Sequence, residues 1–186
     1  IIQHILEKTD SLVLMPTGGG KSICYQLPAL MMEGTTVVIS PLISLMKDQV
    51  ESLQANGIAA RAMNSANNET ENLILRKECL QGKVKLLYIS PERLLQELNF
   101  LIKDMKISLF AIDEAHCISD WGHDFRLEYG KIGRIINGLP SNVAVLATTA
   151  TANDRVIKDL KEQLKEEVFV SRGPLSRNSL HIQVLK

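Results

Sequence analysis

The sequence predicts an α/β domain in which a mostly parallel β-sheet carries helices on both faces. Short apolar runs rich in Val, Ile and Leu recur along the 186 residues, and such runs are typical of strands buried on both faces of a parallel sheet. Stretches whose apolar residues follow helical spacing lie between these runs. Repeated alternation of strand and helix indicates βαβ units, and these units define the fold class.

Each expected strand is one apolar run, and the expected helices lie between runs or at the start of the chain. The runs span 11–15, 35–40, 84–90, 107–113, 143–148 and 167–171. Helical spacing covers 1–8, 23–32, 42–54, 69–81 and 153–166. No capping residue precedes the first helix, so we expect the natural chain to begin upstream of Ile1. Ligands of open parallel sheets bind beyond the carboxyl ends of the strands, and we therefore look for chemistry in the loops after the runs.

The composition argues against several classes of protein. The 21 Lys and Arg residues balance 21 Asp and Glu residues, so a nucleic-acid site would have to be local rather than a general cationic field. Cys24, Cys79 and Cys117 are odd in number and widely spaced, which argues against a disulfide framework and a zinc site. We expect a reducing, intracellular setting. No apolar stretch approaches the roughly 18 to 20 residues of a membrane span.

The segment MPTGGGKS (15–22) follows the first expected strand and leads into a helix. Its glycines allow backbone N–H groups to turn around phosphate oxygens, and the helix N-terminus favours negative charge. This is the pattern of a P-loop, although Met15 stands where the strict pattern has Gly. We expect Lys21 to contact the β- and γ-phosphates and Ser22 to bind Mg²⁺. The nucleotide-binding residues would be Thr17, Gly18, Gly19, Gly20, Lys21 and Ser22. The alternative is a glycine-rich turn without a ligand.

Asp113 and Glu114 form a carboxylate pair at the end of the run 107–113. A carboxylate at the tip of a buried strand can hold the Mg²⁺ that bridges two phosphates, so Asp113 is the expected metal ligand. Glu114 can then orient and deprotonate an attacking water. The alternative for the pair alone is a surface cap of the strand. Combined with the P-loop, the pair predicts hydrolysis of a nucleoside triphosphate such as ATP, with Lys21, Asp113 and Glu114 as the catalytic residues.

Five segments follow one another along the chain: TGGGKS (17–22), SPLISLMKDQV (40–50), ISPER (89–93), DEAHCISDWGHDFR (113–126) and TATA (149–152). In this order they resemble the motifs of the RecQ DNA helicases of helicase superfamily two. The resemblance implies that 1–172 form a P-loop NTPase domain of the RecA-like type, the first motor domain of such a helicase. It implies that 173–186 lead toward a second RecA-like domain. The parent protein would couple ATP hydrolysis to 3′-to-5′ translocation and duplex unwinding.

The resemblance also explains the position of Trp121, the only tryptophan in the chain. In RecQ helicases the corresponding segment is an aromatic-rich loop that contacts single-stranded DNA and couples its binding to ATP hydrolysis. The matching residues are Trp121, His123, Asp124, Phe125 and Arg126. Bases stack on aromatic rings with little sequence preference, and an arginine can contact phosphate or stack, which agrees with this role. The alternative is that Trp121 and Phe125 pack beneath the loop.

Five further residues have supporting roles that the resemblance implies. Ser40 and Arg93 would contact DNA phosphates, although each also fits a plain strand-to-helix turn. Thr149 and Thr151 would link the γ-phosphate site to the DNA site through hydrogen bonds to the segment 113–116. His116 would belong to the same network, or it is a structural histidine.

The expected partners are therefore single-stranded and duplex DNA and a second motor domain of the same parent chain. By the resemblance, the element that reads adenine would lie upstream of Ile1, so adenine selectivity is not predicted from these residues. Two other functions fit part of the pattern: a non-catalytic fragment that binds nucleotide or single strands, and an RNA-directed motor of the DEAH type.

Overall fold

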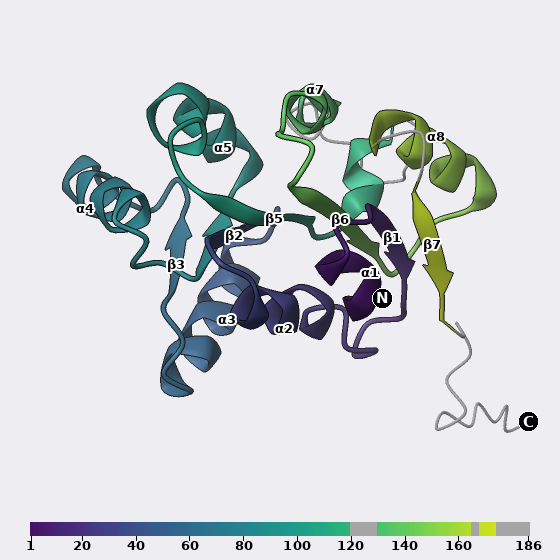
Figure 1. The fold of residues 1–186 in the computed structure, drawn as a ribbon, viewed down its shortest axis with the longest axis horizontal. Coiled ribbons are helices and arrows are strands. Elements are labelled where there is room, and N and C mark those ends of the chain that lie inside the picture. The colour runs from purple at the N-terminus through teal and green to yellow at the C-terminus, as the bar shows by residue number, and fades with distance from the viewer. Residues whose placement is uncertain (120–129, 165–167, 174–186) are drawn as a thin grey trace, which may run out of the picture.

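The computed structural model describes residues 1–119, 130–164 and 168–173 and shows seven parallel strands in one sheet (Figure 1). The strand order is β3-β4-β2-β5-β6-β1-β7. The strands are β1 (Ser11–Leu14), β2 (Thr35–Ile39), β3 (Ala60–Met63), β4 (Leu86–Ile89), β5 (Ile107–Ile112), β6 (Ala144–Thr149) and β7 (Phe169–Arg172). The parallel sheet expected from the sequence is confirmed, and six of its strands coincide with the six apolar runs.

Helices cover both faces of the sheet, as expected (Figure 1). One face carries α1 (Ile2–Leu6), α2 (Ile23–Met31) and α3 (Ile43–Ala55). The other carries α4 (Glu69–Leu80), α5 (Pro91–Glu97), α7 (Ile132–Asn137) and α8 (Asp154–Leu164). Two apolar cores result, one between each helical layer and the sheet. None of the helices in the described ranges combines the length and the apolarity that a bilayer span requires.

Several short elements were not expected from the sequence. These are the edge strand β3, the helix α7, a π-helix η1 (Leu98–Ile102) that continues α5, and a 3₁₀-helix η2 (Ala115–Ile118). Strand β3 has the sequence ARAM, and only its first and last residues are buried. Arg61, in its middle, pairs with Glu78 of α4 at 3.0 Å. A short edge strand with a charged residue lacks the continuous apolar run by which the other strands are recognised.

Candidate nucleotide-binding site

The loop between β1 and α2 has the backbone conformation of a glycine-dependent turn. Gly18 and Gly20 have φ of +80° and +89°, a region that other residues rarely adopt. A Cβ atom on Gly19 would lie 2.9 Å from the carbonyl oxygen of Pro16, which is closer than atoms pack. Each of the three glycines is therefore required for this loop. Lys21 lies across it and donates a hydrogen bond from Nζ to the carbonyl oxygen of Met15 at 3.2 Å.

The carboxyl ends of four adjacent strands, β2, β5, β6 and β1, meet next to this loop. A cavity of about 270 Å³ lies there. Its walls come from the loop, from the first turns of α2 and α3, and from the ends of β2, β4 and β5. The lining includes Thr17, Gly18, Gly20, Lys21, Ser22, Ser40, Asp113 and Glu114. The tertiary structure thus brings the glycine-rich loop and the carboxylate pair to one cavity, although about ninety residues separate them in the sequence.

Asp113 is buried, with 7% of its surface exposed, at the end of β5. Its Oδ1 accepts hydrogen bonds from the hydroxyl of Thr148 and from the amide of Glu114, each at 3.0 Å. Burial raises the pKa of Asp113 because it disfavours the charged carboxylate, while the Thr148 hydroxyl, the Glu114 amide, Lys21 and His116 act in the opposite direction. Thr148 lies in β6, the strand next to β5, and the sequence analysis did not identify it.

Glu114 has a left-handed backbone with φ of +52°, which is uncommon for a residue with a side chain. Strained backbone of this kind is concentrated at functional sites. The Glu114 side chain is 25% exposed, and its Oε2 lies 3.3 Å from Nδ1 of His116. The Glu114 side chain is therefore mostly in contact with the protein, and part of it lines the cavity.

His116 connects Glu114 to the segment 149–152. Its Nδ1 lies 3.0 Å from the hydroxyl oxygen of Thr149, which itself donates a hydrogen bond to the carbonyl oxygen of Thr151 at 3.0 Å. Since the single hydroxyl proton of Thr149 is used in that bond, His116 must donate through Nδ1–H. The hydrogen bond that the sequence predicted between these two segments is present, while its part in coupling stays a prediction.

The donor atoms at the cavity fit a magnesium ion. Mg²⁺ prefers oxygen ligands, and it is usually held by one or two protein groups together with phosphates and water. Ser22 and Asp113 supply a hydroxyl and a buried carboxylate to the same cavity. The described ranges contain no group of three or more His, Cys, Asp or Glu side chains that could hold a metal ion by themselves. Phosphates and water would therefore have to complete the coordination of a magnesium ion here.

The two residues that were predicted to contact DNA phosphates differ in their surroundings. Ser40 lines the cavity but is only 2% exposed, and within the described residues its hydroxyl group has no hydrogen-bond partner. Arg93 is 15% exposed in its side chain, and its Nη2 lies 2.8 Å from Oε1 of Glu97. Its charge therefore faces a protein carboxylate here. Trp121, His123, Asp124, Phe125 and Arg126 lie outside the described residues.

A polar cluster beside the cavity was not recognised from the sequence. Nε2 of Gln26 donates to Oε1 of Gln49 at 2.7 Å and lies 3.1 Å from the hydroxyl of Tyr88. Tyr25 meets Tyr88 edge to face, with 6.3 Å between ring centroids. Gln49 lies within the quoted segment 40–50, and Tyr25 lies in the helix after the P-loop. Their positions beside motifs are the signal by which the sequence could have identified them. The contact between Gln26 and Tyr88 spans 62 residues and has no signal in the sequence.

Comparison with known proteins adds independent information. The profile of the DEAD/DEAH box helicase family matches residues 1–160. The chain is 50% identical over 165 residues to the ATP-dependent DNA helicase RecQ of Pasteurella multocida, covering 88% of this chain and 26% of that protein. It is 47% identical over 182 residues to the ATP-dependent DNA helicase RecQ of Bacillus subtilis, covering 96% of this chain and 31% of that protein. The chain thus spans about a quarter to a third of the length of the curated relatives it matches.

A solved structure agrees in fold. The helicase domain of Hef from Pyrococcus furiosus superposes with a TM-score of 0.65 at 20% sequence identity, over 90% of this chain and 35% of that one. At this identity the likeness concerns the fold alone.

Proposed function

The chain belongs to the DEAD/DEAH box helicase family, and on this basis we propose that it is the first RecA-like motor domain of a RecQ-type, ATP-dependent DNA helicase. One observation carries the proposal: the P-loop and the Asp113–Glu114 pair line the same cavity, in a chain about half identical to RecQ helicases. Residues 1–172 would form the motor domain, and 173–186 would lead to a second domain. The parent protein would translocate 3′ to 5′ on DNA and open duplexes, within the nucleoid or the nucleus.

The residues of the cavity have distinct roles in this proposal. The amides of residues 17–22 and the Lys21 amino group bind the phosphates of ATP, and Ser22 and Asp113 would hold Mg²⁺, which neutralises charge on the phosphate oxygens. Glu114 positions a water in line with the γ-phosphate and takes its proton. Its left-handed backbone and the nearby imidazole of His116 orient the carboxylate toward the cavity. Catalysis then depends on positioning and charge more than on covalent chemistry.

The contacts of Glu114 also supply a route to the DNA-binding segment. The buried 3₁₀-helix η2 carries the chain from Glu114 to Ser119, directly before the segment that contains Trp121. His116, in the same helix, contacts Thr149 at 3.0 Å. A displacement of η2 would therefore be transmitted to Glu114 and to residues 149–152 together. This is the reciprocal linkage that coupling of DNA binding to hydrolysis requires.

The first test is ATP hydrolysis by the full-length protein with single-stranded DNA or RNA as activator. We expect stimulation by DNA, and turnover that falls by about 10² to 10⁴-fold in Glu114→Gln while ATP binding is retained, as for loss of a general base. Turnover at the unsubstituted rate in Glu114→Gln would remove Glu114 as the base. No stimulation by either nucleic acid would favour a passive binding fragment, and stimulation by RNA alone would favour the RNA-directed motor.

The second test concerns coupling. Trp121→Ala should leave hydrolysis without DNA nearly unchanged and remove most of the stimulation by DNA, because a stacking platform contributes about 1–3 kcal/mol per base. The measurement is the ATPase rate as a function of DNA concentration, with Phe100→Ala as the matched control at an exposed aromatic residue on η1. Equal loss of the rates with and without DNA would instead assign Trp121 to packing.

A further inference from the structure

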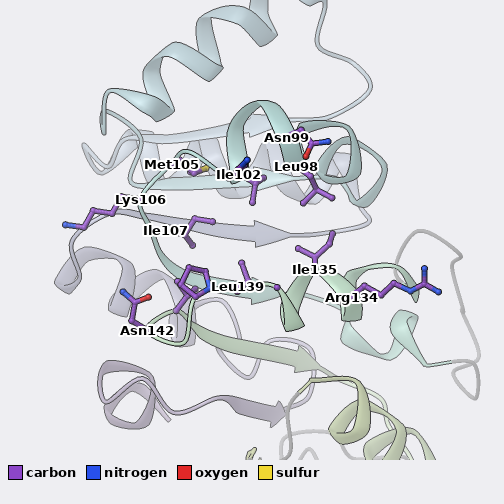
Figure 2. A pocket seen from close by; sticks show the side chains of 14 residues that line it. Leu98, Asn99, Ile102, Met105, Lys106, Ile107, Arg134, Ile135, Leu139 and Asn142 are labelled. Carbon is purple, nitrogen blue, oxygen red and sulfur yellow. The ribbon is translucent and has the colours of Figure 1, made fainter.

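A second cavity, of about 660 Å³, lies at the amino ends of the strands, on the opposite side of the sheet from the strand ends that carry Asp113 (Figure 2). It is placed between η1 and α7, at the amino ends of β5 and β6, where Ile107 begins β5 and Val143 precedes β6. Its volume falls in the range of about 300–1,000 Å³ typical of ligand-binding pockets. The nucleotide site uses the carboxyl ends of the same strands, so the function proposed above does not account for this cavity.

The walls of the cavity are mainly aliphatic. Leu98 and Ile102 come from η1, and Ile135 and Leu139 come from α7 and the turn after it, on the facing side (Figure 2). No aromatic ring lines the cavity among the described residues. The wall from η1 is a π-helix of five residues, a rare conformation that occurs frequently at functional sites. These walls suit aliphatic or aromatic side chains of a ligand and offer no platform on which bases could stack.

The rim of the cavity is cationic. Three of its lining residues are basic, Lys103, Lys106 and Arg134, and among the described residues that line it none is acidic. Figure 2 shows Lys106 at one end and Arg134 at the other. Lys106 donates to Glu33 at 2.8 Å. Lys103 and Arg134 are exposed, and within the described part of the chain neither forms an ion pair. Two cationic side chains are therefore available to an anionic ligand.

The backbone beneath the rim is held in place. The carbonyl oxygen of Lys106 accepts a hydrogen bond from the amide of Thr35 at 2.8 Å. Gly34 approaches so closely that a Cβ atom on it would lie 2.7 Å from the same oxygen. The turn that carries Lys103 and Lys106 is thus anchored to the start of β2. A preformed site of this kind binds without the cost of ordering a loop.

We propose that this cavity is a docking site for a short acidic peptide segment of a partner protein, with large apolar side chains between its carboxylates. Apolar side chains would fill the space between η1 and α7, and flanking Asp or Glu residues would meet Lys103 and Arg134. Lys106 and Arg134 lie at opposite ends of the aliphatic groove (Figure 2), and this separation of positive charge favours an extended peptide over a compact anion. Nucleic acid is disfavoured because the walls are aliphatic.

The test begins with the full-length protein and a random peptide library displayed on phage. Peptides that bind the protein should be enriched in Asp and Glu next to Leu, Ile or Phe. Synthetic fluorescein-labelled copies of the enriched peptides are then titrated by fluorescence polarisation. Lys103→Glu/Arg134→Glu should weaken binding by about tenfold, since two exposed charge pairs are lost. The matched control, Lys77→Glu/Lys158→Glu, makes the same change of net charge at exposed positions on α4 and α8 and should change affinity less than about twofold.

A second variant tests the apolar wall. Leu139→Asp places a carboxylate at the cavity and should weaken binding more than about tenfold, with a melting curve recorded to confirm that the variant is folded. Addition of a fatty acid or a single-stranded oligonucleotide should not displace the peptide. The proposal is overturned if no acidic apolar peptides are enriched, if both variants bind them like the unsubstituted protein, or if either competitor displaces them.

Discussion

Glu97 in α5 and Asp113 after β5 are both buried carboxylates, with 0% and 7% of their surfaces exposed, but their neighbours differ. Arg76 donates to both oxygens of Glu97 at 2.7 Å, and Arg93 adds a second guanidinium at 2.8 Å. Within the described part of the chain, Asp113 accepts hydrogen bonds from two neutral groups, the hydroxyl of Thr148 and the amide of Glu114. Lys21 acts on Asp113 only at a distance, because its amino group donates to Met15.

The difference separates a structural charge from one that suits a ligand. Two arginines neutralise Glu97 and join α4 to α5, so it needs no other cation. Burial has the largest effect on the pKa of Asp113 and raises it despite the opposing hydrogen bonds and charges, so ionisation of this carboxyl group is disfavoured by its burial. A cation bound at the cavity would relieve that cost. Two substitutions, followed in three measurements, would break or sharpen this contrast.

The largest expected effect is on catalysis. Asp113→Asn should reduce ATP turnover by about 10³-fold or more, equivalent to about 4 kcal/mol of transition-state stabilisation, because the variant lacks the carboxylate that we propose as the ligand for Mg²⁺. The measurement is steady-state ATP hydrolysis at saturating ATP over a series of Mg²⁺ concentrations. Asp104→Asn, at an exposed carboxylate between η1 and β5, is the control and should hydrolyse ATP normally. A normal rate in Asp113→Asn would mean that Asp113, too, is structural.

The second effect is on stability. Glu97→Gln should lower the free energy of unfolding by about 3 kcal/mol, because two partly buried guanidinium groups lose the buried carboxylate that they share, and only Arg76 keeps another carboxylate, the exposed Glu69. Urea denaturation followed by circular dichroism measures this loss. Glu69→Gln removes another carboxylate from Arg76, but Glu69 is 68% exposed, so the loss should stay below about 1 kcal/mol. Similar losses in both variants would contradict the assignment of Glu97 as the structural charge.

The smallest effect is the pH dependence of stability at Asp113. A carboxyl group whose folded pKa is raised favours folding in its neutral form, and this contribution is lost as pH rises through the folded pKa. Without Mg²⁺ or nucleotide, Asp113→Asn should therefore be more stable than the unsubstituted protein at neutral pH. The difference should shrink as pH falls through the raised pKa and vanish below about 3.9, the ordinary value for Asp.

Urea denaturation of the two proteins between pH 4 and pH 8 tests this dependence. Asp154→Asn, which makes the same substitution at an exposed carboxylate on α8, is the control. If Asp113→Asn is the less stable protein at neutral pH, the carboxylate is better compensated than its contacts indicate.

Much of the fold was predictable because its elements depend on local pattern. Strands β5 and β6 are buried on both faces, and their apolar runs are therefore continuous. Helices α3 and α4 are buried on one face, and their apolar residues therefore follow helical spacing. Strand β3 was not predictable, because it lies at an edge and Arg61 interrupts its apolar character. The π-helix η1 was not either, because no residue pattern distinguishes it from the end of α5.

The residues of the candidate site also fall into those that the sequence predicted and those that it did not. The P-loop and the pair Asp113–Glu114 were predicted because their residue types follow one another in the chain. Thr148 was not, because it reaches Asp113 from a neighbouring strand, 35 residues away in sequence. The ion pair of Arg76 with Glu97 spans 21 residues and has no pattern in either helix. The assignment of Arg93 to DNA remains a prediction, now beside its observed contact with Glu97.

The sequence by itself determined the alternation of strands and helices, the glycine-dependent loop and the identity of the acidic pair, since all three depend on interactions between near neighbours in the chain. The tertiary structure decided the strand order, in which only β6 separates β5 from β1, so that the loop after β1 and the carboxylates after β5 line one cavity. It also decided which buried carboxylate is neutralised. Compensation of a charge depends on which distant side chains share its low-dielectric surroundings, and only the packed sheet and helices determine that.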